Sequence, residues 1–373
     1  MHEAEAWRWA ALSNFSAAAT TWTFKAKPLF EALDLIHLLG FMDVELWAEG
    51  VHLDPRGEPP DLDELAAAMD RIGLAAHSIH APFRGLDLTS PDPGVRNRAV
   101  SVLSRTIEMA GRLDCPYVVV HVDGAGERGA GGAPTQHSGA GGSGAETGGR
   151  DAFVDEAEAF ERAAAALTVL CKHAQDHHVT ILVENQPDPA RRRFGASVAD
   201  LLELIHMVGA PNIGICFDVP HAVVSTGGWE KELRAALPYV RSVHASDTEG
   251  GSDAHWPLGR GAIDWRRVLE VLEEAGYDGG FVLEVAGGEA ALEESFAALQ
   301  GASGAGARGD ADAGARADTD AGADARGDAG ARADTDAGAG ARGDAGARAD
   351  ADADADADGD DAPSSSLRSR EAK

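Results

Sequence analysis

The chain of 373 residues is poor in cysteine and has no long apolar run. Its three cysteines, Cys115, Cys171 and Cys216, are too few and too scattered for a disulfide framework, and their apolar neighbours favour small buried hydrophobic residues. No run approaches the ~20 apolar residues that a membrane span needs. Two glutamates lie within residues 1–6, and no apolar stretch with a basic front follows them. We therefore expect no signal peptide and a cytoplasmic location.

Basic residues are scarce beside acidic ones, at 32 against 62, which gives a formal net charge of -30. Residues 301–373 contain 17 acidic and 9 basic residues, so the rest of the chain carries -22. Such a body repels polyanions at long range, which disfavours tight nonspecific binding of nucleic acid. No stretch interleaves basic and aromatic residues in the way that a strand-separating surface does.

Two segments lack the apolar periodicity of a folded chain. Residues 301–373 are almost entirely Ala, Gly, Asp, Arg and Thr, and they predict a disordered low-complexity tail. Residues 124–150 are mostly Gly, Ala, Ser and Thr, and they predict a flexible, disordered insertion. The remaining residues of 1–300 are enough for one large α/β domain with a sizeable core.

Short runs of strand character alternate with runs of helical period through residues 1–300. The expected strands are Trp9–Phe15, Asp43–Trp47, Ala75–His80, Tyr117–His121, Thr180–Glu184, Ile213–Asp218, Ser242–Ala245 and Phe281–Glu284. The expected helices are Lys27–Gly40, Leu62–Gly73, Val95–Leu113, Phe153–His177, Val198–Met207, Trp229–Leu237, Trp265–Ala275 and Ala290–Leu299. This alternation predicts a parallel sheet, and eight units favour a closed (β/α)8 TIM barrel over a doubly wound open sheet.

Polar residues that can bind a metal recur at the ends of these strands. They are Glu45, His80, His121, Glu184, Asp218, His221, His244 and Glu284. Any one of them alone is more simply a hydrogen-bonded barrel residue. Because the carboxyl ends of barrel strands meet on one face, the recurrence favours a shared site. Imidazole with carboxylate suits Zn, Mn, Co or Fe(II), and a carboxylate-rich set also tolerates Mg.

Five motifs resemble a known family in their order and spacing. They are His80-Ala-Pro-Phe83, Val120-His121, Leu182-Val-Glu184-Asn185-Gln-Pro187, Phe217-Asp218-Val-Pro-His221-Ala222 and the run Asp253-Ala-His255-Trp-Pro-Leu-Gly259-Arg-Gly261-Ala-Ile-Asp264-Trp265. Together they resemble the xylose isomerase-like TIM-barrel superfamily, and more closely its sugar phosphate isomerase/epimerase branch. The resemblance runs from the first strand to Leu299 and leaves out the insertion and the tail.

The resemblance implies a divalent metal ion (Mn, Zn, Mg or Co) held by Glu184, Asp218, His244 and Glu284. It also implies that Glu184 and Glu284 lie on opposite faces of a bound sugar, where one removes the proton α to the carbonyl and the other returns it. His221 would bind a substrate oxygen. The expected protein is an isomerase or epimerase that acts on a sugar, sugar phosphate or related polyol through a metal-stabilised enediolate.

The same superfamily contains the type IV apurinic endonucleases, which cut DNA with three zinc ions, and their pattern also fits. The positions would be His80 and His121 for one ion, His221, Asp253 and His255 for another, and Glu184, Asp218, His244 and Glu284 for the third, with Glu184 bridging. The acidic body and the Pro257–Asp264 turn favour a small sugar-like substrate over nucleic acid. A noncatalytic sugar-phosphate-binding barrel is a third hypothesis.

Several charged residues keep two interpretations. Arg191, Arg192 and Arg193 follow the fifth strand, and with Arg260 they are candidates to bind a phosphate group or are simply solvated. Glu45 fits neither metal pattern, so a substrate wall and an ordinary polar barrel residue both remain open. The sequence leaves the oligomeric state open, a homo-oligomer included, and it indicates no membrane partner.

Overall fold

The computed structural model describes residues 16–123, 148–189 and 194–306, with the backbone alone for 148–156 and 301–306. The chain divides into two units, Met1–Arg316 and Ala317–Lys373, and all described residues belong to the first. Among the described residues, no helix is both long and apolar enough to cross a membrane.

Some predictions fall on residues that the structure does not describe. The predicted strand Trp9–Phe15 lies there, as do residues 124–147 of the predicted insertion and residues 307–373 of the predicted tail. The first strand of the barrel follows the predicted one directly, at Ser16–Thr20.

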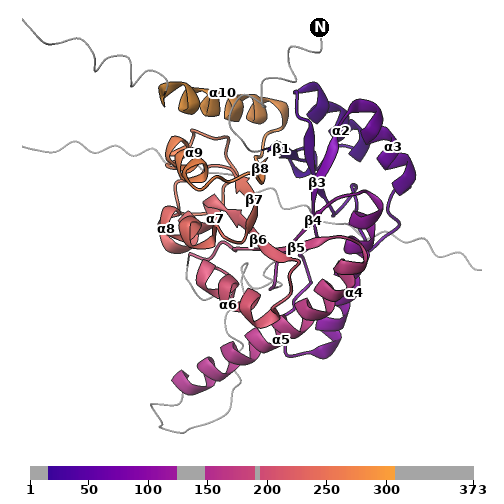
Figure 1. The fold of residues 1–373 in the computed structure, drawn as a ribbon, viewed down its shortest axis with the longest axis vertical. Coiled ribbons are helices and arrows are strands. Elements are labelled where there is room, and N and C mark those ends of the chain that lie inside the picture. The colour runs from indigo at the N-terminus through magenta and orange to yellow at the C-terminus, as the bar shows by residue number, and fades with distance from the viewer. Residues whose placement is uncertain (1–15, 124–147, 190–193, 307–373) are drawn as a thin grey trace, which may run out of the picture. The chain divides into compact units, whose positions relative to one another are not determined.

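Eight parallel strands close into a barrel at the centre of the molecule (Figure 1). They are β1 Ser16–Thr20, β2 Asp43–Trp47, β3 Ala75–His80, β4 Tyr117–Val120, β5 Thr180–Glu184, β6 Ile213–Asp218, β7 Val240–Ala245 and β8 Gly280–Leu283. Each strand pairs with the next one in the chain, and β1 pairs with β8 to close the ring. The predicted (β/α)8 TIM barrel is therefore confirmed.

Helices surround the strands, as Figure 1 shows. They are the 3₁₀ helix η1 Thr21–Phe24, and α2 Leu29–Leu38, α3 Leu62–Ile72, α4 Pro93–Arg112, α5 Gly148–Asp176, α6 Val198–Val208, α7 Val219–Thr226, α8 Glu230–Ala236, α9 Trp265–Glu274 and α10 Gly288–Gly306. Two of them, η1 and α7, were not predicted. Helix α5 begins inside the predicted insertion, and α10 continues past the predicted start of the tail.

The helix ends follow from residues that satisfy free backbone groups. Asp61 precedes α3 and accepts hydrogen bonds from the first-turn N–H groups, while Gly73 ends the helix at a φ of 72° that costs glycine little. Helix α6 begins with a capping box in which Ser197 and Asp200 bond each other's backbone. These short-range signals are legible in sequence, and the predicted bounds of both helices lie within one residue of the observed ones.

The main core lies between the barrel and its helices, where alternate strand residues point outward. A second, smaller cluster of buried apolar residues consists of Val119, Leu182 and Cys216, one from each of three adjacent strands β4, β5 and β6. All three cysteines are buried and free, as predicted.

Two register shifts decide which polar residues lie level with one another in neighbouring strands. Between β2 and β3 the register shifts after Val44, so that Glu45 pairs with Ser78. Between β6 and β7 it shifts after Ile215, so that Asp218 pairs with His244. Bulges of this kind re-aim side chains and are common beside active sites.

Candidate metal and proton-transfer site

Four predicted metal ligands come together where strands β5 to β8 end. Glu184 and Asp218 are the last residues of β5 and β6, His244 is the penultimate residue of β7, and Glu284 follows β8 directly. One ligand atom from each of the four lies within 4.8 Å of those of the other three. Glu184, Asp218 and His244 are buried, and the Glu284 side chain is 12% exposed. Three of the four side chains are therefore closed to solvent, and the fourth, Glu284, is partly open to it.

Asp218 is fixed in place by hydrogen bonds of its backbone and of its carboxylate. Its backbone N–H donates to the Asn185 side chain at 2.8 Å, and the Asn185 amide donates back to the Asp218 carbonyl at 2.8 Å. Its Oδ1 accepts the backbone N–H of His221 at 2.6 Å and so caps helix α7. The end of β5, the end of β6 and the start of α7 are thus fixed relative to one another.

The ring of His244 presents one nitrogen to the other ligands. Its Nε2 lies 3.1 Å from Glu45 Oε2. Its Nδ1 lies 3.0 Å from Glu284 Oε2 and 3.5 Å from Glu184 Oε1, yet this buried atom makes no aligned hydrogen bond. A buried ring nitrogen among carboxylate oxygens fits a divalent cation, since imidazole and carboxylate are ligands that Zn, Mn and Co share.

Two further predicted histidines meet the far side of the Glu184 carboxylate. His80 Nε2 lies 3.2 Å from Glu184 Oε2, and His121 Nε2 lies 2.9 Å from the same oxygen. His80, Glu184 and His244 form a second group whose ligand atoms lie within 4.8 Å of one another. Glu184 therefore lies between two sets of imidazoles, each facing a different carboxylate oxygen.

The remaining predicted residues form a cluster next to His221. Asp253 Oδ2 lies 3.1 Å from His221 Nε2 and 3.1 Å from His255 Nε2. The other nitrogen of His255 hydrogen-bonds to the Glu284 carbonyl at 3.1 Å, and His255 has a left-handed φ of 47°. The other nitrogen of His221 hydrogen-bonds to the Asn185 carbonyl at 2.8 Å. A substrate oxygen that binds His221 would therefore compete with the Asp253 carboxylate for Nε2.

The comparison with known families adds to this geometry. Residues 33–302 match the model of a family described as xylose isomerase-like TIM barrel. The chain belongs to this family. The superfamily resemblance carried by the strand-end motifs is thereby confirmed.

Relatives of this xylose isomerase-like chain include proteins named as sugar epimerases. It is 28% identical over 271 residues to the uncharacterized protein MJ1311 of Methanocaldococcus jannaschii, and the matched region covers 70% of this chain and 80% of that protein. It is 25% identical over 263 residues to L-ribulose-5-phosphate 3-epimerase UlaE of Escherichia coli O8 (strain IAI1), covering 68% and 81%. A solved D-tagatose 3-epimerase-like protein is 26% identical with a TM-score of 0.63, covering 77% and 97%.

Charges that face one another in the site shift the pKa of its members. Burial alone raises the pKa of Glu184, but the charges of His121 and His244 outweigh it and hold the pKa well below its usual range. Burial lowers the pKa of His80, yet the hydrogen bond and charge of Glu184 raise it to about 9. Burial and the Glu184 charge raise the pKa of Asp218 to about 7. Protons thus neutralise part of the site's negative charge, and a bound cation would replace them.

The predicted phosphate-binding arginines gain no support from the described residues. Arg191, Arg192 and Arg193 lie outside them, as Figure 1 marks with a grey trace. Arg260 binds both carboxylate oxygens of Glu294 at 2.6 Å on an exposed surface. A phosphate at Arg260 would have to displace Glu294, and the assignment stays a prediction.

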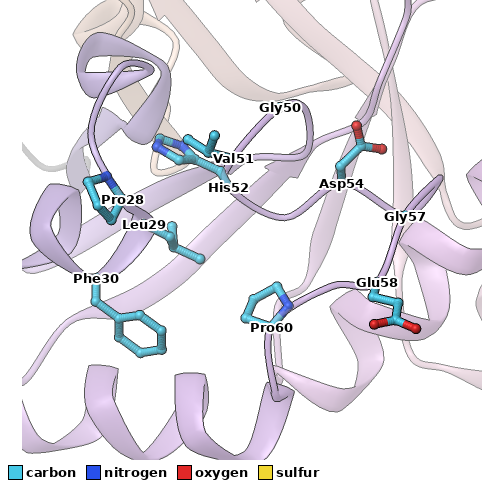
Figure 2. Close-up of a pocket in the computed structure, with 10 residues that line it drawn as sticks. All are labelled: Pro28, Leu29, Phe30, Gly50, Val51, His52, Asp54, Gly57, Glu58 and Pro60. Carbon is cyan, nitrogen blue, oxygen red and sulfur yellow. The ribbon is translucent and has the colours of Figure 1, made fainter. Parts of the chain in front are cut away.

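A cavity of about 450 Å³ lies apart from this cluster, between the segments that connect β1 to α2 and β2 to α3 (Figure 2). Its lining includes His52, whose two ring nitrogens already have partners in Thr21 Oγ1 at 3.1 Å and the Lys27 carbonyl at 2.9 Å. Asp54, also in the lining, is paired with Arg56. No member of the carboxylate and histidine cluster lines this cavity.

Sequence reasoning left two buried carboxylates of this xylose isomerase-like barrel undecided, Glu45 with two interpretations and Asp247 with no specific role. Glu45 hydrogen-bonds the ring of His244 from across the barrel. Asp247 anchors the connection from β7 to α9, which carries Asp253 and His255. The signal for Asp247 was an acidic residue just past a strand and ahead of a glycine-rich turn with free N–H groups. The strand pattern marked Glu45 as a polar residue, but it gave no sign of the contact with His244, which is 199 residues away.

Proposed function

We propose that this protein is a divalent-metal-dependent isomerase or epimerase of a sugar, sugar phosphate or related polyol. The observation that carries the proposal is the convergence of Glu184, Asp218, His244 and Glu284, whose ligand atoms lie within 4.8 Å of one another at the mouth of the barrel. The similarity to UlaE and to the D-tagatose 3-epimerase-like protein supports a sugar as the substrate class.

The reaction needs a proton removed from one carbon and a proton returned. A bound divalent cation supplies positive charge that makes the proton α to the substrate carbonyl more acidic. Glu184 and Glu284 supply the carboxylates, and both have a pKa below the usual range, so each is ionised and able to accept a proton at neutral pH. The Glu284 side chain is the more open of the two to solvent and substrate, at 12% exposed against 1%. Epimerisation requires one carboxylate to take the proton in its ionised form, while the other, after it has taken up a proton from solvent, returns that proton on the opposite face.

The test is exchange of the substrate's α proton in heavy water. L-Ribulose 5-phosphate and D-tagatose, the sugars named for the relatives, are incubated with metal-loaded protein, and deuterium at the α carbon is followed by NMR. We expect Glu284→Gln to lower the exchange rate by at least ~100-fold, because a neutral amide accepts no proton. Glu31→Gln, at an exposed pair with Lys27, is the matched control and keeps the wild-type rate.

Two outcomes would reject the proposal. The first is a Glu284→Gln variant that keeps full turnover and full metal content. The second is wild-type protein that binds metal and sugar phosphate but exchanges no α proton with any sugar tried, a result that supports the noncatalytic barrel.

A second candidate, a three-zinc phosphodiesterase that acts on abasic DNA, is favoured by the histidines outside the four-ligand set. His80 and His121 meet Glu184 Oε2, and Asp253 Oδ2 lies between His221 and His255. Elemental analysis of purified protein separates the two candidates. About three zinc ions per chain with cleavage of abasic duplex DNA supports the phosphodiesterase, and about one ion with no cleavage supports the isomerase.

A further inference from the structure

Glu45 is a completely buried carboxylate in the barrel interior, on β2. Its Oε2 accepts the Ser78 hydroxyl at 2.8 Å and lies 3.1 Å from Nε2 of His244. Its Oε1 has no hydrogen-bond partner among the described residues. A buried carboxylate costs free energy unless its charge is compensated, so its presence here needs a reason.

The contact between Glu45 and His244 crosses the interior of the barrel. Strands β2 and β7 are separated by β1 and β8 in the closed sheet. Ala17 and Ala19 of β1 pack with the main core cluster, so alternation along the strand turns Ala18 toward the barrel interior. Ala18 pairs with Asp43 of β2 and Val282 of β8, and its single methyl group takes little space in the interior.

An ionised carboxylate only accepts hydrogen bonds, so the ring nitrogen that faces it must carry the hydrogen. For His244 this nitrogen is Nε2, which leaves the lone pair of the neutral ring on Nδ1. Nδ1 is the atom that lies 3.0 Å from Glu284 Oε2 and 3.5 Å from Glu184 Oε1. A carboxylate behind a ligating histidine fixes its tautomer and ring orientation and makes it a better ligand.

We infer that Glu45 is a positioning residue that holds His244 as its Nε2–H tautomer, with Nδ1 directed at a divalent cation. The inference rests on the metal site of the proposed function and adds a residue that is not itself a ligand. Ser78 has a smaller part, because its hydroxyl holds Glu45 Oε2 in place. The role departs from both interpretations that the sequence left open for Glu45.

The test measures metal affinity and the hydrogen on Nε2 of His244, not turnover. Dissociation constants for Zn²⁺ and Mn²⁺ are obtained by competition with a chelating dye for wild type, Glu45→Leu, Glu45→Gln and Ser78→Ala. We expect Glu45→Leu to weaken binding 10- to 100-fold, at about the size found for such outer partners. Glu45→Gln keeps an oxygen that accepts the Nε2 hydrogen, so its loss is smaller, and that of Ser78→Ala is smaller still.

The hydrogen on Nε2 provides a readout that a purely structural role would not move. In zinc-loaded protein with ¹⁵N-labelled histidine, NMR is expected to show a His244 Nε2–H proton that is shifted downfield and exchanges slowly in wild type, because it is hydrogen-bonded to Glu45, and that loses both properties in Glu45→Leu. A folded Glu45→Leu variant with affinity within twofold of wild type and an unchanged Nε2–H signal overturns the inference. If Glu45→Leu does not fold, Glu45→Gln with wild-type affinity overturns it.

The same measurements keep this inference separate from the proposed activity. Wild-type protein that binds metal through His244 Nδ1 and loses affinity in the Glu45 variants supports the inference even if no sugar exchanges its α proton. Wild-type protein that binds no divalent cation overturns both.

Discussion

At the scale of single residues, Asp247 shows how one buried carboxylate organises a functional loop. It is fully buried, and its two oxygens accept four hydrogen bonds. The donors are Thr248 N at 2.9 Å, Gly259 N at 2.8 Å, Ile263 N at 3.3 Å and Trp265 Nε1 at 3.2 Å. Because these donors span the connection from β7 to α9, Asp247 sets where Asp253 and His255 lie.

We predict that Asp247→Asn destabilises the protein by ~2–4 kcal/mol, because the amide group faces donors and leaves them buried without an acceptor. Urea denaturation gives the free energy of unfolding. Asp264→Asn is the matched control: Asp264 caps α9, and since Asn caps helices as well as Asp does, its effect should stay within ~0.5 kcal/mol. Equal stability of the two variants would contradict the role given to Asp247.

The four ligands of the candidate metal site could be predicted from the sequence, while the residues that hold them could not. Glu184, Asp218 and Glu284 each end a run of strand residues, so a barrel brings them together whatever the details of its register. The contact of Glu45 with His244 joins two strands that β1 and β8 separate, over 199 residues of chain. A contact between residues so far apart leaves no local pattern in the sequence.

At the scale of elements, strand predictions were accurate because strand residues are apolar and bounded by turns. Strands β2, β3, β5 and β6 have the predicted bounds. Helix α7 was missed because it has only eight residues, six of them buried, so it shows no clear helical period of apolar and polar residues. Its signal was Asp218 followed by Pro220, an N-cap ahead of a proline in the first turn. Asp218, a candidate metal ligand, thus both ends β6 and caps α7.

The connection from β7 to α9 gives a prediction at this scale. A Cβ on Gly261 would lie 2.2 Å from Asp247 Oδ1 and 2.4 Å from the Thr248 carbonyl. We therefore expect Gly261→Ala to destabilise the protein by at least ~2 kcal/mol, since the loop must move to admit the methyl group. Gly251→Ala in the same connection meets open space and is the control, expected within ~0.5 kcal/mol. Thermal and urea denaturation measure both, and a neutral Gly261→Ala would show that the loop is not held by Asp247.

At the scale of the whole molecule, the closed barrel could be predicted because eight strands alternate with helices, while the full length of the last helix could not. Helix α10 continues to residue 306, although 301–306 are only Gly, Ala and Ser. The absence of an apolar period was taken as the end of structure, yet α10 extends through two alanines, a serine and three glycines, at a cost of about 1 kcal/mol for each glycine relative to alanine.

The charge balance of the site predicts that stability depends on pH and that a cation bound there would change this dependence. Without a cation, His80 has its pKa raised from 6.5 to about 9 by Glu184. A histidine with a raised pKa stabilises the fold fully below about pH 6.5, and this stability is lost as the pH rises through about 9. Burial is the main cause that raises the pKa of Asp218 from 3.8 to about 7. The protonated carboxyl group therefore also stabilises the fold at low pH, and this stability is lost as the pH rises through about 7.

We therefore predict that the Tm of metal-free protein falls between pH 6.5 and 9. A divalent cation binds deprotonated ligands, so its stabilising effect grows over the same interval. Thermal denaturation in EDTA and in excess Mn²⁺ should give two curves that separate as the pH rises, and Glu284→Gln, which loses one ligand, should bring them closer. Parallel curves would mean that the cation does not replace these protons, and would place metal binding elsewhere than among Glu184, Asp218 and His244.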